Sequence, residues 1–478
     1  MLIGRKEEKQ RLLDCYESDY SQFVAVYGRR RIGKTYLIRE TFDYNFTFNH
    51  TALYNASKDV QISHFCASLK NAGFSKISED NFTPPSTWLK AFYLLEDFIM
   101  ELPKEEKKVI FIDELSWMDT HKSDLITALE GFWNGFASAR KDILLIVCAS
   151  STSWIIDNVI HNKGGLHNRL NCNIKLGQFT LSDCKEFIKT KNITLNDNQI
   201  IECYMIMGGV PYYWSLLDKK YSLYQNIDHI FFAENALLQN EFEYLYASLF
   251  TNPEVYIKLI TAFGKKKVGL TREELIEETN VSNNAALTKR LQDLENCGFI
   301  RSYTKFGSSK KNVYYQLIDN FTLFYYKFLE HKSKDEHFWE NQINTPLINS
   351  WNGLAFERIC LEHVPQIKKK LGISGVLTEV CSWSCKADSD KGVTGSQIDL
   401  LIVRKDQVIN LCEIKYSNKP YTITKSVYEN IVSKVEDLYL VTGTKYAIHK
   451  TMITPYSLVR NSYSDSITSV ITGEDLFQ

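Results

Sequence analysis

Short apolar runs separated by longer helical stretches characterise the first 180 residues. Three of these runs, Phe23–Tyr27, Val109–Ile112 and Ile143–Val147, are rich in apolar side chains and end at turn or charge signals. Such runs are typical of strands that are buried on both faces of a parallel sheet. Because helical stretches alternate with them, residues 1–180 are predicted to form a layered α/β domain.

The second segment, residues 181–252, has Leu, Ile and Phe at helical spacing. The sequence Gly208–Pro211 interrupts this pattern, since Gly and Pro end helices. We therefore predict a small domain of helices with a break at that point. Further along the chain, the charged stretch His331–His337 is the best candidate for a linker.

Residues 253–330 combine short helices with a hairpin. The sequence Thr271-Arg272-Glu273-Glu274 has the form of a capping box and predicts a helix over Glu273–Glu278. Helix, turn, helix and hairpin in this order are typical of a winged-helix domain. The later elements are expected as a helix over 285–297 and strands over 299–306 and 313–317.

A second α/β pattern occupies residues 345–478. It begins with a helical stretch and continues with three strand-like runs. The fold class is therefore α/β and multidomain. The helix is expected over 351–363 and the strands over 376–383, 397–403 and 408–414.

The composition narrows the class of protein. Lys and Arg number 56 against 57 Asp and Glu, which excludes a strongly basic whole-chain nucleic-acid binder but not a local basic face. Apolar runs stay well short of the roughly 20 residues that a membrane span requires. The 11 cysteines are scattered, often within apolar runs, as in proteins of a reducing compartment. We expect a soluble, cytoplasmic protein without a membrane partner.

One motif predicts phosphate binding. The sequence Gly28-Arg29-Arg30-Arg31-Ile32-Gly33-Lys34-Thr35 matches the complete GxxxxGK(S/T) pattern between a predicted strand and a helix that opens at Tyr36. The glycines let backbone N–H groups and the helix N-terminus face the phosphates. Lys34 would supply charge to the β- and γ-phosphates, and Thr35 would offer its hydroxyl to Mg²⁺.

A second motif lies at the end of the run Val109–Ile112, which is followed by Asp113 and Glu114. Asp113 would hold the Mg²⁺ shell, and Glu114 would orient or deprotonate the attacking water. An apolar strand followed by an acid is common by itself. In the same α/β domain as the phosphate loop, it predicts the acidic motif of ATP hydrolysis.

Three further residues have two interpretations each. Ser150 or Ser151, at the end of the next strand, either senses the γ-phosphate or caps the following helical turn. Arg169 is either an arginine finger or sensor, or a surface arginine.

Together these motifs resemble a known ATPase family. The start Leu2-Ile3-Gly4-Arg5-Lys6-Glu7 is similar to the hhGRxxE box of AAA+ relatives that include the archaeal-type ATPases and STAND proteins. The arginine-rich loop and the Gly208–Pro211 break are also similar to that family, so residues 181–252 would be its helical lid. The resemblance implies ATP as the nucleotide and places Gly4 and Arg5 at the adenine side. The alternative for Gly4 and Arg5 is a turn before the first helix.

In that family, a winged helix and a nuclease-like domain of unknown function often follow the ATPase. Asp319–Tyr326 looks like the family's D-P-x-x-x-F-W-Y segment, with Asn320 in place of the proline. The start of the second helix of residues 253–330 would read the major groove, and the wing would meet phosphates. Protein contact is the alternative role. The candidate contact residues are Asn283, Asn284, Thr288, Lys289, Lys305, Lys310 and Lys311.

The C-terminal segment contains a predicted hairpin with acidic residues near its open end. If the turn centres near Asp406, Asp399 lies opposite Glu413, and Lys415 shares a face with Glu413 because the strand period is two. Two acids within reach of each other can bind Mg²⁺, which activates water. Glu357, on the preceding helix, would add a third carboxylate if that helix packs on the sheet.

This set resembles the core of PD-(D/E)xK nucleases, which have a restriction-endonuclease-like fold. Asp399, Glu413 and Lys415 correspond to the motif, and Glu357 to its helical acid. Gln397-Ile398 replaces the proline often found before the aspartate. The resemblance implies metal-dependent cleavage with Mg²⁺ or Mn²⁺, with metal at Asp399 and Glu413. Proteins with this fold can also lose the activity.

The domain prediction is a P-loop ATPase domain over 1–180, a lid over 181–252, a winged helix over 253–330 and a nuclease-like domain over 345–478. We expect ATP turnover to control access of nucleic acid, double-stranded DNA in particular, to the last domain, in nucleic-acid defence or mobile-element processing. One alternative is a STAND-like signalling switch that binds nucleic acid without cleaving it. Another is a remodelling motor, which implies a homo-oligomeric ring and DNA-stimulated turnover through Arg169.

Overall fold

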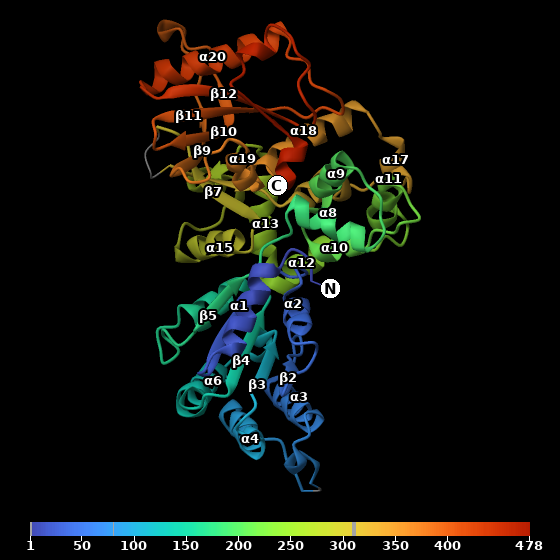
Figure 1. Cartoon of the computed structure of the whole chain (residues 1–478), viewed down its shortest axis with the longest axis vertical. Helices are drawn as coiled ribbons and strands as arrows, with labels where there is room; N and C mark the ends of the chain where they lie inside the picture. Colours follow the sequence, from blue (N-terminus) through green and yellow to red (C-terminus); the bar gives the residue numbers. More distant parts are fainter. Residues whose placement is uncertain (1, 80, 308–311) are drawn as a thin grey trace. The chain divides into compact units, whose positions relative to one another are not determined.

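The computed structural model describes residues 2–79, 81–307 and 312–478. By their contacts they divide into two units. The first unit runs through Gln178 and includes Leu249–Thr251, and the second comprises Phe179–Ser248 and Asn252–Gln478. Each unit is described by itself, and Figure 1 gives the labels of their elements.

The first unit is built on a five-stranded sheet in the order β2-β3-β4-β1-β5. All four neighbouring pairs run parallel, which confirms the prediction for the three apolar runs. The central strands are fully buried, because helices cover both faces. The strands are β1 (Gln22–Tyr27), β2 (Phe48–Thr51), β3 (Lys108–Asp113), β4 (Ile143–Ala149) and β5 (Cys172–Lys175).

Successive residues of β1, β3 and β4 enter different cores, as the two-residue period of a strand requires. Phe23 and Ala25 belong to one buried cluster, and Val24 and Val26 to the cluster on the other face. Helices α1 and α2 supply the second cluster, whereas α3, α4 and α6 supply the first. These helices are α1 (Lys6–Glu17), α2 (Lys34–Thr41), α3 (Lys58–Asn71), α4 (Trp88–Glu101) and α6 (Leu125–Gly131).

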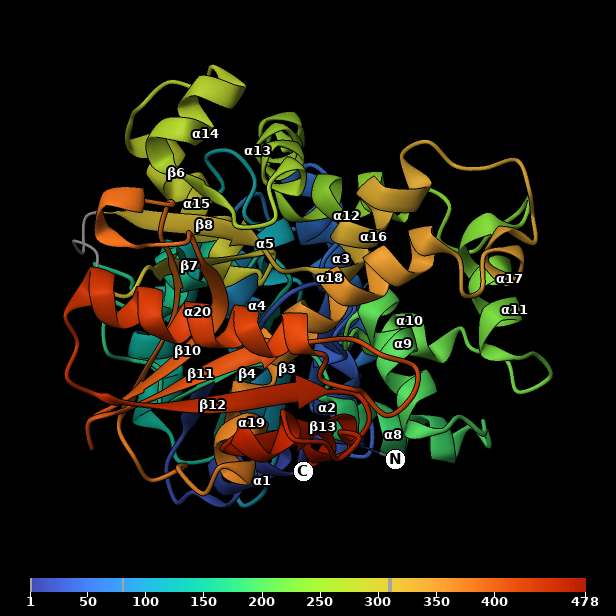
Figure 2. The same cartoon turned by 90° about the horizontal axis from the view of Figure 1, so that it is seen from above.

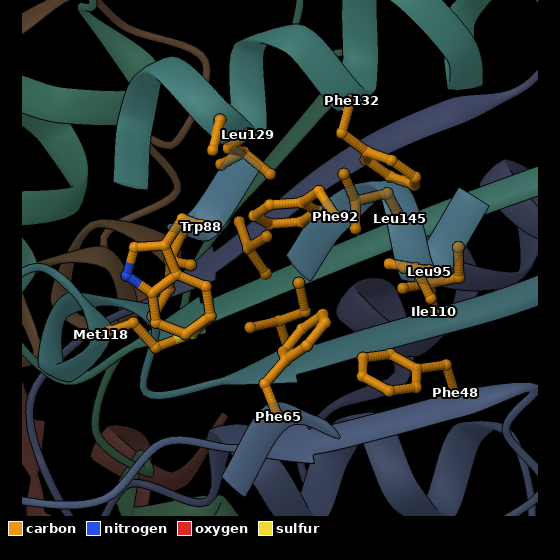
Figure 3. Close-up of a cluster of buried hydrophobic side chains, with 14 of the residues drawn as sticks. Phe48, Phe65, Trp88, Phe92, Leu95, Ile110, Met118, Leu129, Phe132 and Leu145 are labelled. Atoms are coloured by element: carbon orange, nitrogen blue, oxygen red, sulfur yellow. The ribbon is translucent and has the colours of Figure 1, made fainter. Parts of the chain in front are cut away.

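The larger cluster is aromatic. Figure 3 shows Phe65, Trp88 and Phe92 packed together between the helices and the sheet. The rings of Phe65 and Trp88 meet edge to face, with centroids 5.7 Å apart. Burying one such side chain contributes about 1.5–3 kcal/mol, so this core anchors the strands whose ends carry the nucleotide motifs. Shorter elements of the unit are η1 (Ser75–Ser78), α5 (Leu115–Met118), η2 (Phe132–Phe136), η3 (Ala137–Ala139), α7 (Thr152–Ile155) and η4 (Ile156–Ile160).

The second unit begins with helices that the break at Gly208–Pro211 interrupts as predicted. Gly208 ends α9 with a φ of 59°, and Pro211 opens α10. A Cβ at Gly209 would lie 1.9 Å from the carbonyl oxygen of Phe179, so the chain passes too closely there for a side chain. The elements are α8 (Leu181–Thr190), α9 (Asp197–Met207), α10 (Pro211–Ser215), α11 (Leu223–Ile227), η5 (Asp228–Phe232) and α12 (Glu241–Leu249).

A small three-stranded sheet follows, in the order β6-β8-β7, with antiparallel pairs. The capping box of Thr271 and Glu274 forms at the start of α14, as the sequence predicted. Lys310 and Lys311 lie outside the described residues. The elements are α13 (Pro253–Lys265), β6 (Leu270–Thr271), α14 (Arg272–Thr279), α15 (Ala285–Asn296), β7 (Ile300–Thr304) and β8 (Val313–Leu317).

The charged segment 331–337 packs within the second unit. The Lys332 ammonium donates to the Ala233 carbonyl at 3.0 Å. The Asp228 carboxylate accepts from the backbone N–H groups of Trp339 and Glu340 and so caps the short helix that follows. The helices of this region are α16 (Asn320–Phe324), η6 (Tyr325–Leu329), α17 (Phe338–Asn341), α18 (Pro346–Glu362) and α19 (Val364–Lys370).

The C-terminal sheet is mixed, with the order β13-β12-β11-β10-β9. Strands β9 to β11 are antiparallel, and β11 to β13 are parallel. Helix α20 lies along the sheet in Figure 2, and its Leu438 joins the core that the sheet forms on that face. The elements are β9 (Thr378–Ser384), η7 (Ser389–Lys391), β10 (Gln397–Arg404), β11 (Val408–Ile414), α20 (Lys425–Thr442), β12 (Ala447–Thr454), η8 (Ser464–Ser466), β13 (Ser469–Thr472) and η9 (Gly473–Phe477).

The chain is therefore α/β and multidomain, with a parallel-sheet domain and a separate C-terminal domain built on a mixed sheet. Within the described ranges, no helix is both long and apolar enough to cross a membrane.

Candidate nucleotide site and candidate carboxylate site

The phosphate-type loop connects β1 to α2. Gly28 has a φ of 144°, and a Cβ there would lie 2.4 Å from the carbonyl oxygen of Leu176. Gly33 has a φ of 88° and is the N-cap residue of α2. Arg31 also has a positive φ, 70°, which few non-glycine residues adopt. The loop thus turns sharply enough to bring backbone N–H groups and the helix N-terminus to one place.

Lys34 is buried and lies at the centre of this loop. Its ammonium donates to the carbonyl oxygens of Gly28 and Arg29, at 2.8 and 3.0 Å, and to the Ser150 hydroxyl at 3.0 Å. All three acceptors are uncharged. None of these three acceptors forms an ion pair with the ammonium, so an anion bound in the loop can accept charge-assisted hydrogen bonds from it.

The two predicted acids lie beside the loop, at the end of β3. The Thr35 hydroxyl donates to the Asp113 carboxylate at 2.8 Å. Glu114 has a φ of 52°, and its own N–H donates to Asp113 at 3.0 Å. This backbone turn sends the Glu114 carboxylate toward the next strand rather than along its own.

The Glu114 carboxylate is held by Ser150, which directly follows β4. It accepts from the Ser150 N–H at 2.9 Å and from the Ser150 hydroxyl at 2.5 Å. Ser151 is the N-cap residue of α7 but makes no side-chain capping bond. Of the two serines, the structure therefore brings Ser150 to the motifs. Lys34, Thr35, Asp113, Glu114 and Ser150 form one hydrogen-bonded cluster at the carboxyl ends of β1, β3 and β4.

Arg5 connects the start of the chain to the loop. Its guanidinium donates to the carbonyl oxygen of Gly177 at 2.7 Å and to that of Ile32 at 3.4 Å. Gly4, just before it, has a φ of 61°. Both residues thus lie next to the phosphate-type loop, although they are distant from it in sequence.

The remaining predicted residues are placed less centrally. Arg29 is buried, Arg30 is half-buried, and Tyr36 is exposed on α2. Arg169 is exposed in the segment before β5, where its backbone N–H donates to the Leu166 carbonyl. The structure does not bring the side chain of Arg169 into the cluster around Lys34.

The second predicted site lies in the C-terminal sheet. Strands β10 and β11 pair in the predicted register, with Leu400 opposite Cys412, one position inward from Asp399 and Glu413. On the other side, the pairing of β10 with β9 shifts between Ile398 and Leu401, so Asp399 lies at a β-bulge. Bulges re-aim side chains and are frequent next to functional sites.

The sequence predicted three carboxylates and one lysine at this site. The structure adds two more lysines, Lys267 and Lys434. Glu413 is buried and accepts from Lys415 at 2.9 Å and from Lys434 of α20 at 2.7 Å. Lys267, in the turn before β6, contacts Glu357 at 2.8 Å and Asp399 at 3.8 Å. The sequence pattern did not indicate Lys434 or Lys267, because each comes from a distant element and belongs to no motif.

Burial and neighbouring charges shift the pKa values of this group. Burial raises the pKa of Glu357, and the nearby Asp399 carboxylate raises it further, against the opposing effect of Lys267. Burial alone would lower the pKa of Lys415, but the Glu413 carboxylate more than offsets this and raises it. Lys415 is therefore an ammonium at neutral pH.

The three acids do not meet at one point. Among the residues that the structure describes, one group of three His, Cys, Asp or Glu side chains has donor atoms within 4.8 Å of one another. That group is Asp228, His337 and Glu340, whose Asp228 is the cap of α17. Instead, Glu357 and Asp399 both pair with Lys267, whereas Glu413 pairs with Lys415 and Lys434. The ammonium of Lys267 is a cation already seated between two of these carboxylates.

Comparison with known protein families gives a match over the part of the chain that contains the candidate nucleotide site. Residues 2–217 match an ATPase domain predominantly from Archaea. The first part of the chain is an archaeal-type ATPase domain. This family implies ATP as the nucleotide, together with Mg²⁺. Residues 320–431 match a family described as archaeal and bacterial proteins of unknown function.

Similar whole chains are also known. An uncharacterized protein of Methanocaldococcus jannaschii is 24% identical over 463 residues, which cover 93% of this chain and 96% of the relative. A Walker-type ATPase of Pyrococcus abyssi is 15% identical, covers 67% of this chain and 95% of its own, and has a TM-score of 0.47. The ORC2 protein of Aeropyrum pernix, solved in ADPNP–ADP complexes, is 12% identical, with 76% and 96% covered and a TM-score of 0.43.

Proposed function

We propose that this protein binds and hydrolyses ATP and uses the cycle to control a winged-helix module and a metal-dependent nuclease-like domain that acts on double-stranded DNA. The observation that carries the proposal is the cluster of Lys34, Thr35, Asp113, Glu114 and Ser150. It joins the ends of three parallel strands within the part of the chain that matches an archaeal-type ATPase.

The chemistry of the first site follows from the contacts of each side chain. The ATP phosphates would replace the neutral partners of the Lys34 ammonium. Thr35 and Asp113, which share a hydrogen bond, are hard oxygen donors and fit Mg²⁺. Glu114, whose carboxylate Ser150 holds in place, would orient the attacking water. Bound Mg²⁺ would neutralise the phosphate charge that develops during hydrolysis.

The element order α13, β6, α14, α15, β7, β8 supports a winged-helix module. Several of the predicted base-reading side chains are occupied within the protein. Asn284 caps α15 through the Leu287 N–H at 3.0 Å, and Asn283 accepts from Arg272 at 2.9 Å. Thr288 is exposed on α15 and is the better candidate for contact with a base. Lys289 pairs with Asp293, and the Lys305 ammonium lies 4.3 Å from the Tyr314 ring centroid.

The C-terminal site supports metal-dependent cleavage through its donor chemistry. Asp399 and Glu413 are carboxylates, the ligand type that Mg²⁺ and Mn²⁺ prefer. Glu357 and Asp399 already hold the ammonium of Lys267, so these carboxylates accept a cation. A bound metal would supply an activated water and stabilise charge on the phosphate. Lys415, held as an ammonium by Glu413, would position the scissile phosphate.

A DNA-cleavage assay tests the proposal. Supercoiled plasmid and single-stranded DNA are incubated with the protein in Mg²⁺ or Mn²⁺, with and without ATP. Cleavage is expected for the wild type and for Lys425→Ala, whose exposed lysine pairs with Glu429 on the surface of α20. It is expected to be lost in Lys415→Ala, and its response to ATP should be lost in Lys34→Ala.

One observation favours a second function. Lysines already neutralise Glu357 and Glu413, and the predicted acids do not form a group of three. This arrangement suits a domain that binds nucleic acid without cleaving it, as in a STAND-like switch. Intact ATP hydrolysis with DNA binding, but no cleavage by any form of the protein, would favour that function and reject the nuclease.

A further inference from the structure

Lys267 lies on a tight turn whose shape depends on one glycine. The turn runs from Lys266 to Gly269, and the Gly269 N–H donates to the Lys266 carbonyl at 3.0 Å. Gly269 has a φ of 82°, and a Cβ there would lie 2.3 Å from the carbonyl oxygen of Tyr315. Only glycine fits this conformation and this approach, so the turn that presents Lys267 is held in one shape.

Side-chain hydrogen bonds also hold the backbone carbonyls of this turn. The Lys267 carbonyl accepts from the buried guanidinium of Arg358 and from the side-chain amide of Gln316, both at 2.7 Å. The next carbonyl, of Val268, accepts from the Tyr303 hydroxyl at 2.5 Å. Three side chains from α18, β8 and β7 therefore fix the position of two consecutive residues.

Two consecutive residues of α18 hold Lys267 at its backbone and at its side chain. The Arg358 guanidinium donates to the Lys267 carbonyl, and the Glu357 carboxylate accepts from the Lys267 ammonium at 2.8 Å. The ammonium also lies 3.8 Å from Asp399. Glu357 is 13% exposed and Asp399 29%, whereas Lys267 is 43% exposed. The two carboxylates are thus less exposed than the lysine that contacts them.

We propose that Lys267 is a built-in competitor of the divalent metal at the carboxylate site. This inference rests on the proposed metal-dependent function and concerns the regulation of that site. The ammonium balances the mutual repulsion of Glu357 and Asp399, which also raises the pKa of Glu357. A divalent cation bound to Glu357 and Asp399 would repel the ammonium at close range, so the two compete for these carboxylates. Metal binding therefore requires Lys267 to leave, and the fastened turn opposes this movement.

Metal affinity tests the competition directly. Mn²⁺ is titrated without nucleotide, and free Mn²⁺ is followed by electron paramagnetic resonance. Lys267→Gln keeps a donor for Glu357 but removes the charge, and it is expected to bind Mn²⁺ about tenfold more tightly than the wild type, a change of about 1.4 kcal/mol. Lys266→Gln is the matched control, because Lys266 pairs with Glu274 away from the carboxylates. Addition of Asp399→Asn should abolish the gain. Equal or weaker binding by Lys267→Gln would overturn the proposal.

A reciprocal measurement requires no variant. Mn²⁺ should release the Lys267 ammonium in the wild type and raise its rate of acetylation by an N-hydroxysuccinimide ester, measured by mass spectrometry, while that of Lys266 stays constant. An unchanged Lys267 rate with metal bound contradicts the competition.

The plasmid assay separates this inference from the nuclease. Tighter Mn²⁺ binding by Lys267→Gln without cleavage leaves the competition standing and rejects the nuclease. If the protein cleaves DNA but Lys267→Gln leaves its Mn²⁺ affinity unchanged, the nuclease stands and the competition is rejected. Absence of Mn²⁺ binding in every form rejects both.

Discussion

The lysines of the two candidate sites differ in their direct partners. At the nucleotide site, the buried Lys34 ammonium donates to three neutral oxygens. At the carboxylate site, the acids are already paired with ammonium groups: Glu413 with two lysines, and Glu357 and Asp399 with Lys267. An anionic ligand at the first site would not have to break an ion pair of Lys34. Under the proposal above, a metal ion at the second site would have to displace Lys267.

The contrast has a structural origin. The candidate nucleotide site is formed by strand ends and one loop. Its groups that can face phosphates are chiefly backbone N–H groups and the N-terminus of α2. The carboxylate site is formed by side chains from a helix, a hairpin, a second helix and a turn. Charged side chains recessed from water need partners, and this site supplies them from the protein itself.

The largest expected effect tests whether the ion pairs of the carboxylate site matter for stability. Glu413→Gln leaves Lys434, which is 13% exposed, and Lys415 without their shared carboxylate. Loss of one partner from such a recessed pair should lower the free energy of unfolding by about 3 kcal/mol. Urea unfolding measures it. Glu429→Gln, in an exposed pair with Lys425, should change it by less than about 0.5 kcal/mol. Equal effects of the two substitutions would contradict the contrast.

An intermediate effect tests the nucleotide site. Ser150→Ala removes the hydroxyl that joins Lys34 to Glu114, whereas Ser151→Ala removes a hydroxyl that makes no capping bond. A hydrogen bond to a charged group contributes about 1.5–3 kcal/mol, so ATP hydrolysis by Ser150→Ala should fall about tenfold or more. Steady-state phosphate release measures the rate. A similar loss in Ser151→Ala would show that Ser150 has no special role.

The smallest effect concerns pH. Lys267 opposes the rise in the pKa of Glu357, so Lys267→Gln should raise that pKa further. When folding raises the pKa of a carboxyl, the free energy of unfolding falls as the pH rises from the pKa of the unfolded chain to that of the folded protein. The variant should therefore be less stable than the wild type at pH 7 and nearly equal at pH 4. The difference at pH 7 should stay below about 1 kcal/mol, because Lys267 is partly exposed. Chemical unfolding at several pH values measures it, and a constant difference would exclude Glu357 as its cause.

Much of the fold was accessible from the sequence because it depends on local pattern. The apolar runs became parallel strands, the capping box at Thr271 formed, and the break at Gly208–Pro211 ended a helix where expected. The hairpin register also followed from the sequence, since a short turn near Asp406 leaves the two strands little choice of partners. The segment 331–337 was less predictable: its charged composition indicates a linker, but Lys332 and the capping of α17 by Asp228 fasten it to the second unit.

The sequence by itself determined the phosphate-type loop, because eight consecutive residues carry its pattern and its two glycines adopt the positive φ angles that its turn requires. Only the tertiary structure decided which serine joins Lys34 to Glu114, and that Arg169 lies away from them. It also decided that Lys267 and Lys434 reach the carboxylates. Ninety residues separate Lys267 from Glu357, and no local pattern records such a contact. Its existence depends on how a turn, a helix and a hairpin pack, which is a property of the folded chain.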